Sequence, residues 1–189
     1  MSRREEIVKA AQHAFLKFGI EKITLDDIAQ ECGVKKTALY YYFKGKDEIL
    51  AEMLQQKMEE FEQIVKQEVF KQKNVKDRLR TYMQTKIRMM KENLPFIKLL
   101  EKEGLPLKAK EFMKIHKRKS MDTDFCLVKD VLTQGIKNKR VSYKVDDSLV
   151  LMIMGVTYGI IVGRFVENCD WDIDAMIETS INVIFKGIE

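Results

Sequence analysis

A run of lysines and tyrosines near the N-terminus is the clearest sign of chemistry in this 189-residue chain. Residues 35–46, KKTALYYYFKGK, include four lysines and no acidic residue. Lysines attract the phosphates of nucleic acid whatever its sequence. Tyrosine hydroxyls bond phosphate oxygens, and tyrosine rings contact thymine methyl groups. We therefore expect a surface for double-stranded DNA made by Lys35, Lys36, Thr37, Tyr40, Tyr41, Tyr42 and Lys46.

Two short helices joined by a tight turn must position this surface. Thr24 has the character of an N-cap, and Asp27 follows it at capping-box spacing. Ala29, Gly33 and Leu39 stand at helix-turn-helix spacing. The alanine lets the helices cross closely, the glycine allows the positive φ of the turn, and the leucine anchors the second helix in the core. This arrangement presents the second helix to a DNA major groove.

The remaining sequence predicts helices only, about nine in all, and hence an all-α fold. Apolar residues recur at helical spacing in segments 3–18, 46–71, 75–91, 96–103, 107–138 with an interruption near 120–124, 148–167, and from 173 onward. Only two prolines occur, and strand-like alternation is scarce. We divide the chain into an N-terminal three-helix DNA-binding domain, residues 1–46, and a larger helical domain, residues 47–189.

Composition excludes several classes of protein. The net charge of +5 suits a nucleic-acid partner without requiring one. Cys32, Cys126 and Cys169 form no CxxC motif, so neither a disulfide framework nor a metal site is expected, and a reducing cytoplasm fits best. The N-terminus lacks an apolar signal core. No P-loop, nucleotide-binding glycine fingerprint, HExxH motif or nucleophile elbow occurs, which predicts no enzyme, no catalytic residue and no cofactor.

Residues 148–163 form an uncharged segment that is shorter than the ~20 residues a membrane-spanning helix needs. No membrane partner is expected, and a helix this apolar must be covered on every side. Gly155, Gly159 and Gly163 recur every four residues and make a flat seam for another helix. That helix belongs either to a second copy or to the same chain. The predicted dimer interface consists of these glycines together with Ile177, Ile181 and Ile184 of the last helix.

Two other basic clusters allow two interpretations each. Arg3 and Arg4 either reach DNA phosphates or form a solvated helix end. Residues 108–119 hold six basic residues against one acid. They make either a second nucleic-acid surface or a solvated helix face, and the apolar stripe through Phe112 and Ile115 favours the second interpretation.

The N-terminal 50 residues resemble the tetracycline-repressor (TetR) family of transcriptional regulators. The resemblance is carried by Phe15, Gly19, Thr24, Ile28, Ala29, Gly33, Val34, Leu39, Tyr40, Tyr42, Phe43, Lys46 and Leu50. It implies an all-α homodimer whose first three helices bind DNA. The later helices would enclose a small-molecule pocket, and the last two would form a four-helix dimer interface.

Carried over by position, the resemblance implies that Thr24, Tyr40 and Lys46 meet phosphates. It places Lys36, Thr37 and Tyr41 against bases or flanking phosphates. The sequence departs from the family at residues 35–37, where serine, a basic residue, and glycine or proline are frequent, and at Tyr42, where histidine is common. These departures affect which operator sequence is read and not how DNA is bound.

The sequence thus predicts a DNA-binding transcriptional regulator, a repressor released from a palindromic operator by a small-molecule effector. Eleven methionines suit an adaptable cavity and an apolar or amphipathic effector. The candidate pocket residues mix apolar bulk with a few polar groups: Tyr82, Met83, Met90, Phe112, His116, Met154 and Tyr158. The alternative is a DNA-binding architectural or partner-recruiting module that has no ligand.

Overall fold

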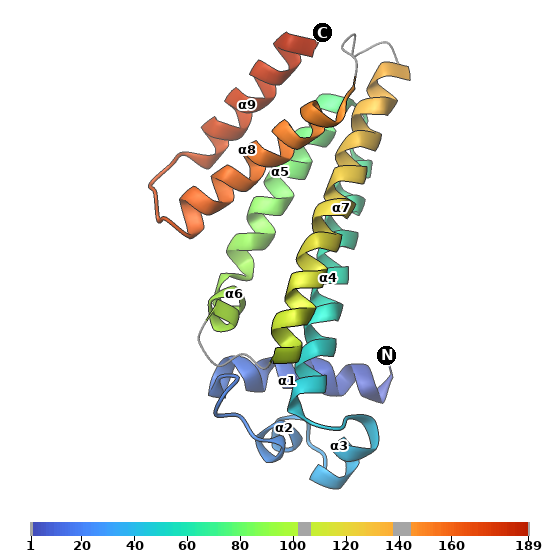
Figure 1. Ribbon diagram of the computed structural model, residues 1–189, viewed down its shortest axis with the longest axis vertical. Helices are drawn as coiled ribbons and strands as arrows, with labels where there is room; N and C mark the ends of the chain where they lie inside the picture. Colours follow the sequence, from blue (N-terminus) through green and yellow to red (C-terminus); the bar gives the residue numbers. More distant parts are fainter. Residues whose placement is uncertain (1, 102–106, 138–144, 189) are drawn as a thin grey trace. The chain divides into compact units, whose positions relative to one another are not determined.

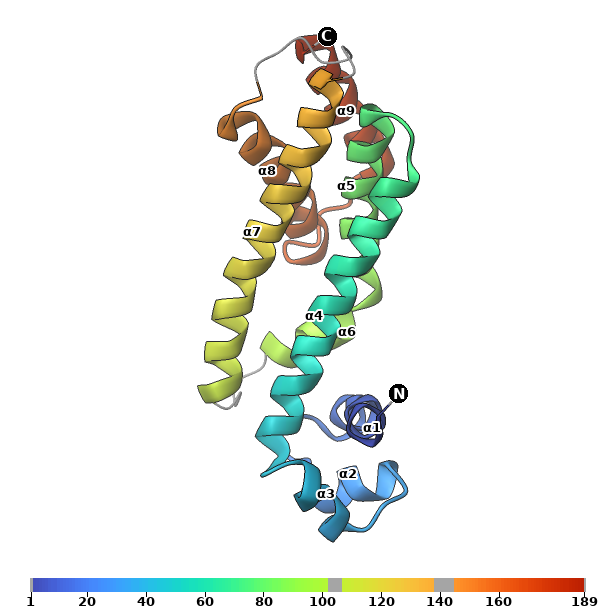
Figure 2. The ribbon, with the colours of Figure 1, turned by 90° about the vertical axis from the view of Figure 1, so that its right-hand side faces the viewer.

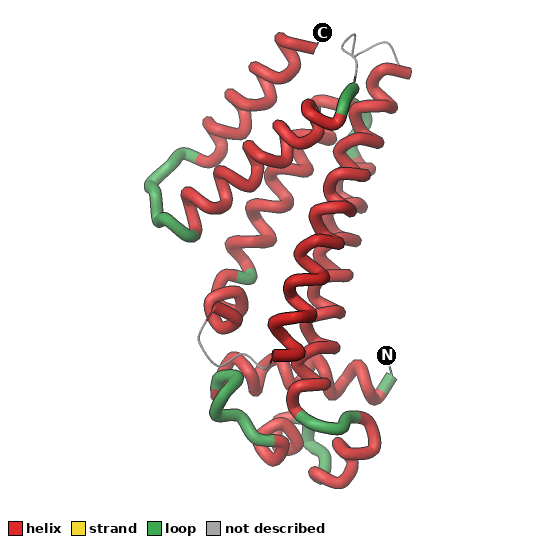
Figure 3. Tube along the Cα trace, in the orientation of Figure 1, coloured by secondary structure: helices red, strands yellow, loops and turns green. Residues whose placement is uncertain are grey.

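The computed structural model describes residues 2–101, 107–137 and 145–188, and all regular structure in these ranges is helical (Figures 1 and 3). The nine helices of this described part are α1 (Arg3–Phe18), α2 (Leu25–Glu31), α3 (Lys36–Tyr42), α4 (Lys46–Lys71), α5 (Val75–Glu92), α6 (Leu94–Glu101), α7 (Leu107–Lys137), α8 (Asp147–Phe165) and α9 (Ile173–Ile188). The predicted all-α fold is confirmed.

Capping boxes begin both α1 and α2. The Ser2 hydroxyl accepts the Glu5 N–H at 3.3 Å, and the Glu5 carboxylate accepts the Ser2 N–H at 2.7 Å. Thr24 and Asp27 repeat the pattern at 3.2 and 2.8 Å. Each box satisfies N–H groups that have no partner inside the helix. The cap at Thr24 agrees with the sequence-based expectation.

Gly33 forms the turn between α2 and α3. Its φ of 64° lies in the left-handed region that glycine adopts without steric cost. Its N–H donates to the Gln30 carbonyl at 3.1 Å. In α3, Leu39 is fully buried and joins the core that contains Phe15 and Ile28. The turn and this anchor fix α3 beside α2, and Figure 2 shows both helices beneath α1, which is seen end-on.

Two helices differ from their predicted extents. α6 begins at Leu94, two residues earlier than expected, because Pro95 falls in the first turn, where its missing N–H is not needed. α7 runs without a break, so the predicted interruption near residues 120–124 is wrong. Within this unbroken helix the Thr123 hydroxyl donates to the Lys119 carbonyl at 3.0 Å.

The contacts between residues divide the chain into two compact units. The first comprises Met1–Glu60 and Leu94–Arg118, and the second Phe61–Asn93 and Lys119–Glu189. α4 and α7 therefore each contribute residues to both units. The first unit has its own core, to which α6 contributes Phe96. This division does not test the functional boundary predicted after residue 46, which stays a prediction.

In the second unit α5 packs against α8 and α9. α8 is apolar nearly all round, but Leu151, Met152 and Tyr158 are about half exposed, at 54%, 48% and 58%. The described residues cover this helix on one side, and the exposed side is available to a second copy, one of the two sources of cover that the sequence allowed. Asp147–Val166 is, among the described residues, the helix long and apolar enough to cross a membrane. Core helices of soluble proteins meet the same criteria, so this is weak support for a membrane span.

Candidate nucleic-acid interface

The outer face of α3 holds most of the side chains predicted to meet DNA. Tyr41 is 83% exposed and Tyr40 is 55% exposed, whereas Leu39 and Phe43 on the opposite face are buried. The exposed set is Lys35, Lys36, Thr37, Tyr40 and Tyr41. The structure thus gathers the predicted basic and aromatic groups on one accessible helix face. Whether they contact DNA stays a prediction.

Tyr42 is half-buried and supports Tyr41. The two rings meet edge to face, with centroids 4.9 Å apart and an interplanar angle of 85°. Such pairs favour one ring orientation. Tyr41 therefore projects from α3 in a defined direction although it is almost fully exposed.

Lys36 links α3 to the start of α2. Its Nζ lies 2.7 Å from the Asp26 carboxylate, and this hydrogen bond raises the pKa of the lysine. Both side chains are well exposed, so the ion pair contributes little to stability. Lys36 is consequently held near the α3 surface by a partner that a phosphate could replace.

Thr24 is exposed at the start of α2, but its hydroxyl already has partners. Its Oγ1 donates to the Asp27 carboxylate at 2.6 Å and accepts the Asp27 N–H. The hydroxyl bond to the carboxylate, and then the bond from the Thr24 N–H, lower the pKa of Asp27. The first role of Thr24 in the structure is therefore to start α2.

Lys46 is placed differently from the exposed lysines of α3. Its Nζ donates to the main-chain carbonyls of Ile20, Glu21 and Ile23 at 3.2, 3.0 and 3.0 Å. An ammonium group has three N–H donors. All of them face carbonyls of the α1–α2 connection, so in this conformation Lys46 ties α4 to that connection.

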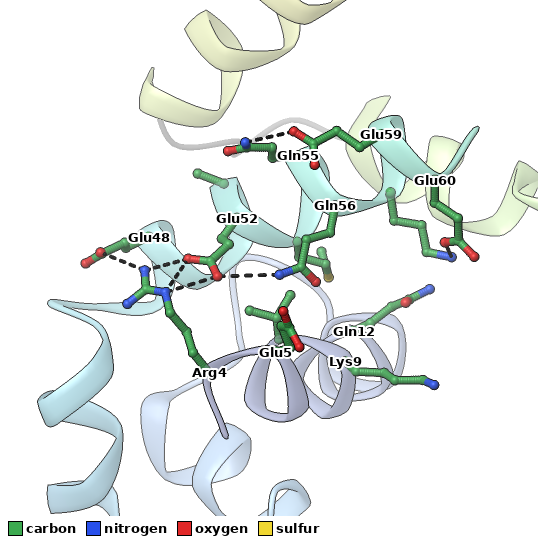
Figure 4. A pocket seen from close by; sticks show the side chains of 14 residues that line it. Arg4, Glu5, Lys9, Gln12, Glu48, Glu52, Gln55, Gln56, Glu59 and Glu60 are labelled. Atoms are coloured by element: carbon green, nitrogen blue, oxygen red, sulfur yellow. Dashed lines mark hydrogen bonds and ion pairs between the residues drawn. The ribbon is translucent and has the colours of Figure 1, made fainter. Parts of the chain in front are cut away.

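A groove of about 820 Å³ runs between α1 and α4 of the first unit (Figure 4). Glutamates and glutamines of α4 line one wall, and the other wall includes Arg4, Glu5, Lys9 and Gln12 of α1. Figure 4 shows the Arg4 guanidinium directed at Glu48 and Glu52. The Arg4 side chain is therefore ion-paired with α4, and whether Arg3 or Arg4 reaches DNA phosphates stays a prediction. No sequence signal indicated this contact, since Arg4 and Glu52 lie 48 residues apart.

The predicted effector residues do not all lie in one unit. Tyr82 and Met83 are buried in the core of the second unit, and Met90 and Met154 pack against that core. Tyr158 of the same unit is 58% exposed, which places it outside this cluster. The half-buried His116 belongs to the first unit. The side chain of Phe112 lies outside the described residues.

An ion pair between Lys86 and Asp124 lies beside Tyr82 in the second unit. Lys86 Nζ and Asp124 Oδ2 form an ion pair at 2.7 Å, with 25% and 15% of the side chains exposed. Burial, and then Asp124, raise the pKa of the Tyr82 hydroxyl, which stays protonated. The sequence-based set did not include Lys86 or Asp124, because apolar periodicity does not indicate which polar side chains turn inward.

The predicted interface residues fall into three environments. Ile177, Ile181 and Ile184 are buried in the core of their own unit. A Cβ on Gly163 would lie 2.0 Å from the Trp171 ring, so this glycine packs against its own chain. Cβ atoms on Gly155 and Gly159 would meet open space. Another helix could therefore approach α8 at Gly155 and Gly159, whereas Trp171 already covers Gly163.

Metal and redox sites find no support among the described residues. No group of three or more potential metal ligands occurs there. All three cysteines are free, and burial raises the pKa of the Cys32 thiol, which disfavours the reactive thiolate.

The geometry defines a class of protein. A three-helix unit presents the second helix of a helix-turn-helix, with an accessible basic and aromatic face, as DNA-binding domains of this class do.

Comparison with known proteins finds a family match in the N-terminal part of the chain. Residues 7–53 match the family described as bacterial regulatory proteins, tetR family. The HTH-type transcriptional regulator TtgR of Pseudomonas putida is 41% identical over 51 residues, which is 27% of this chain and 24% of TtgR. The chain therefore spans about a quarter of the length of this curated relative. The N-terminal part of this chain is therefore similar to the DNA-binding region of tetR-family transcriptional regulators.

Solved structures share the fold over nearly the whole chain. A TetR transcription regulator from Haloarcula marismortui has a TM-score of 0.75 at 20% identity, covering 98% of this chain and 97% of its own. FadR from Bacillus subtilis, in complex with stearoyl-CoA, has a TM-score of 0.66 at 19% identity and covers 98% and 99%. Identities this low establish the common fold alone.

Proposed function

We propose that the protein is a repressor that binds a palindromic DNA operator as a homodimer and is released from it by a small-molecule effector. The exposed face of α3 is the observation that carries this proposal. Lys35 and Lys36 supply the phosphate attraction, while Thr37, Tyr40 and Tyr41 supply groups for base edges and the backbone. Such a protein works in the cytoplasm.

A second copy of the protein would add the DNA contacts that a single α3 is too short to make. α3 has seven residues, so a single copy makes few contacts with DNA. Two copies enter successive major grooves when they lie one duplex turn apart, ~34 Å. The exposed apolar side chains of α8 support this pairing, and we place the interface on Leu151, Met152, Tyr158, Gly155 and Gly159. Ile177, Ile181 and Ile184 lie behind that face, in the core.

The proposed effector is amphipathic. The core of the second unit combines Met83, Met90 and Met154 with the polar group of Lys86 and Asp124. Methionines adapt their shape to apolar chains, and the partly exposed Lys86 could bind an acidic head group. A long-chain acyl-CoA has both parts, and FadR, whose fold is similar, has been solved with stearoyl-CoA.

Release from DNA requires that the effector bind one conformation better than another. α4 is the proposed lever, because it begins next to α3 and its residues 61–71 belong to the second unit. In one conformation of the dimer the two α3 helices are one duplex turn apart, and in another they are not. An effector lowers the affinity for DNA only as far as it binds the second conformation more tightly than the first.

The test begins with a duplex selected from a random-sequence pool by the native protein. Fluorescence anisotropy at low salt measures its binding, and light scattering measures the mass of the free protein. We expect dimers, tight binding, and release by stearoyl-CoA but not by coenzyme A alone. A monomer, or the absence of any selected duplex, would exclude the proposal. Tight binding that no acyl-CoA or other amphipathic compound relieves would favour the DNA-binding module without a ligand.

A further inference from the structure

Arg4 of α1 contacts two other parts of the first unit, the end of α3 and the start of α4. Its Nε donates to both carboxylate oxygens of Glu52, at 3.0 and 2.7 Å. Its Nη2 donates to Glu48 at 3.3 Å, and its Nη1 donates to the main-chain carbonyl of Tyr42. The guanidinium carbon also lies 4.1 Å from the centre of the Phe43 ring. One side chain thus joins α1, the end of α3 and the first turns of α4.

Arg4 reaches α3, the helix proposed to read DNA, through the main-chain carbonyl of Tyr42. Tyr42 is the last residue of α3, and the final carbonyls of a helix lack partners within it. α3 has no side-chain cap at its start and no basic residue in its last turn. A helix of seven residues is not stable alone. Arg4 therefore supplies the charged C-terminal partner that α3 itself lacks.

The surroundings of Arg4 are unfavourable for a DNA phosphate. Two carboxylates, Glu48 and Glu52, face its single positive charge, so the group has a net charge of −1. Further glutamates line the same groove (Figure 4). The neighbouring Arg3 differs, because its ion-pair partner is Glu6 on its own helix. The two adjacent arginines thus have different roles.

We propose that Arg4 is a positioning residue, which fixes the orientation of α3 by joining the Tyr42 carbonyl to Glu48 and Glu52 of α4 and does not bind DNA phosphate. The proposal rests on the DNA-reading function proposed for α3. Arg4 acts through α3, so its loss should impair sequence reading more than general attraction to DNA.

The full-length native protein and the variants Arg4→Met, Glu52→Gln and Arg3→Met are compared on two duplexes. One duplex is selected by the native protein from a random pool, and the other has the same composition in shuffled order. Arg3→Met is the matched control, because it removes the same charge one residue away. Titrations at several salt concentrations give the affinity and its salt dependence.

We expect Arg4→Met to bind the selected duplex roughly tenfold more weakly, about 1.4 kcal/mol, and the shuffled duplex within twofold of native. Its salt dependence should match that of the native protein. Glu52→Gln should weaken selected binding in the same direction although it makes the protein more positive. If only net charge mattered, Glu52→Gln would bind DNA more tightly than the native protein. Comparing Arg4→Met with Glu52→Gln therefore separates a positioning role from an effect of charge.

A phosphate role for Arg4 would weaken both duplexes alike and reduce the slope of log K against log salt by roughly 0.9 per protomer. That result, or tighter binding by Glu52→Gln, would overturn the proposal. Circular dichroism at the assay temperature identifies variants that have unfolded. For an unfolded Arg4→Met, Arg4→Lys replaces it; the lysine keeps the charge but lacks the planar fork, and selected binding should still fall.

Amide hydrogen exchange without DNA separates this proposal from the proposed function. Residues 36–42 should exchange faster in Arg4→Met and Glu52→Gln than in the native protein and Arg3→Met. Faster exchange together with no DNA binding by the native protein would refute the repressor and keep the positioning role. Unchanged exchange in α3 would refute the positioning role whatever the DNA result.

Discussion

Replacement of Lys46 by methionine tests the contacts of that residue most directly. The substitution keeps much of the aliphatic chain but removes the ammonium that donates to Ile20, Glu21 and Ile23. We expect the variant to be less stable than the native protein. The three carbonyls belong to the connection between α1 and α2, so the loss should loosen the whole helix-turn-helix.

Two opposing effects set the size of the change. Hydrogen bonds to charged groups contribute about 1.5–3 kcal/mol each when buried. Lys46 is half-exposed, and water can replace it at some of the carbonyls, so three bonds give roughly 2–3 kcal/mol. A positive charge in the first turn of α4 is unfavourable to the helix dipole by about 0.3–1 kcal/mol. The net loss is therefore roughly 2 kcal/mol, or about 4–8 °C in Tm for a chain of this size.

Urea unfolding followed by circular dichroism measures this loss as a lower midpoint at an unchanged m value. Lys22→Met is the control, because Lys22 is exposed and its side chain bonds no other described residue. If Lys46→Met were as stable as native, relief of the helix dipole would outweigh the carbonyl bonds and the reasoning would be refuted. A fall of roughly 0.9 per protomer in the DNA salt slope would instead support the phosphate role that the family resemblance implies.

Two further predictions concern α8 and α2. Gly163→Ala should lower the free energy of unfolding by about 1–3 kcal/mol, because its Cβ would displace the Trp171 ring. Within one chain Gly159→Ala meets open space, so it should raise the free energy of unfolding of the dissociated protomer by up to about 1 kcal/mol, although the same methyl group would face the partner in the proposed dimer. At protein concentrations where protomers are dissociated, urea midpoints that shift together would contradict the pair. Thr24→Val should lower Tm at pH 7. Since the folded pKa of Asp27 lies below its ordinary 3.8, the stabilisation is complete above about pH 5 and is lost as pH falls through the folded value. The Tm difference should therefore narrow in acid, and a constant gap from pH 7 to pH 3 would contradict this.

The sequence predicted α2, α3 and the turn between them well, because their signals are local. Thr24 and Asp27 start α2 through bonds within three residues, and Gly33 turns the chain through its own φ. Leu39 is identified as inward by its spacing alone. These features depend on neighbours along the chain, so no knowledge of the tertiary structure was needed.

The features that the sequence did not predict depend on distant partners. Arg4 and Glu52 are 48 residues apart, and Lys46 and Ile20 are 26 apart. Periodicity assigns a side chain to a helix face but not to the neighbour that covers that face. For the same reason Gly163 looked like part of an open seam, although Trp171 of the α8–α9 connection fills it.

The contact between Trp171 and Gly163 also gives the protein an internal optical probe. Trp171 is the only tryptophan in the chain and is 41% exposed. Selective excitation at the red edge of its absorption therefore avoids the tyrosines of α3 and reports on one place, where the α8–α9 connection packs against α8. A shift of its emission on dilution would report events at the proposed dimer face. The same signal should stay constant when only the contacts of Arg4 are changed.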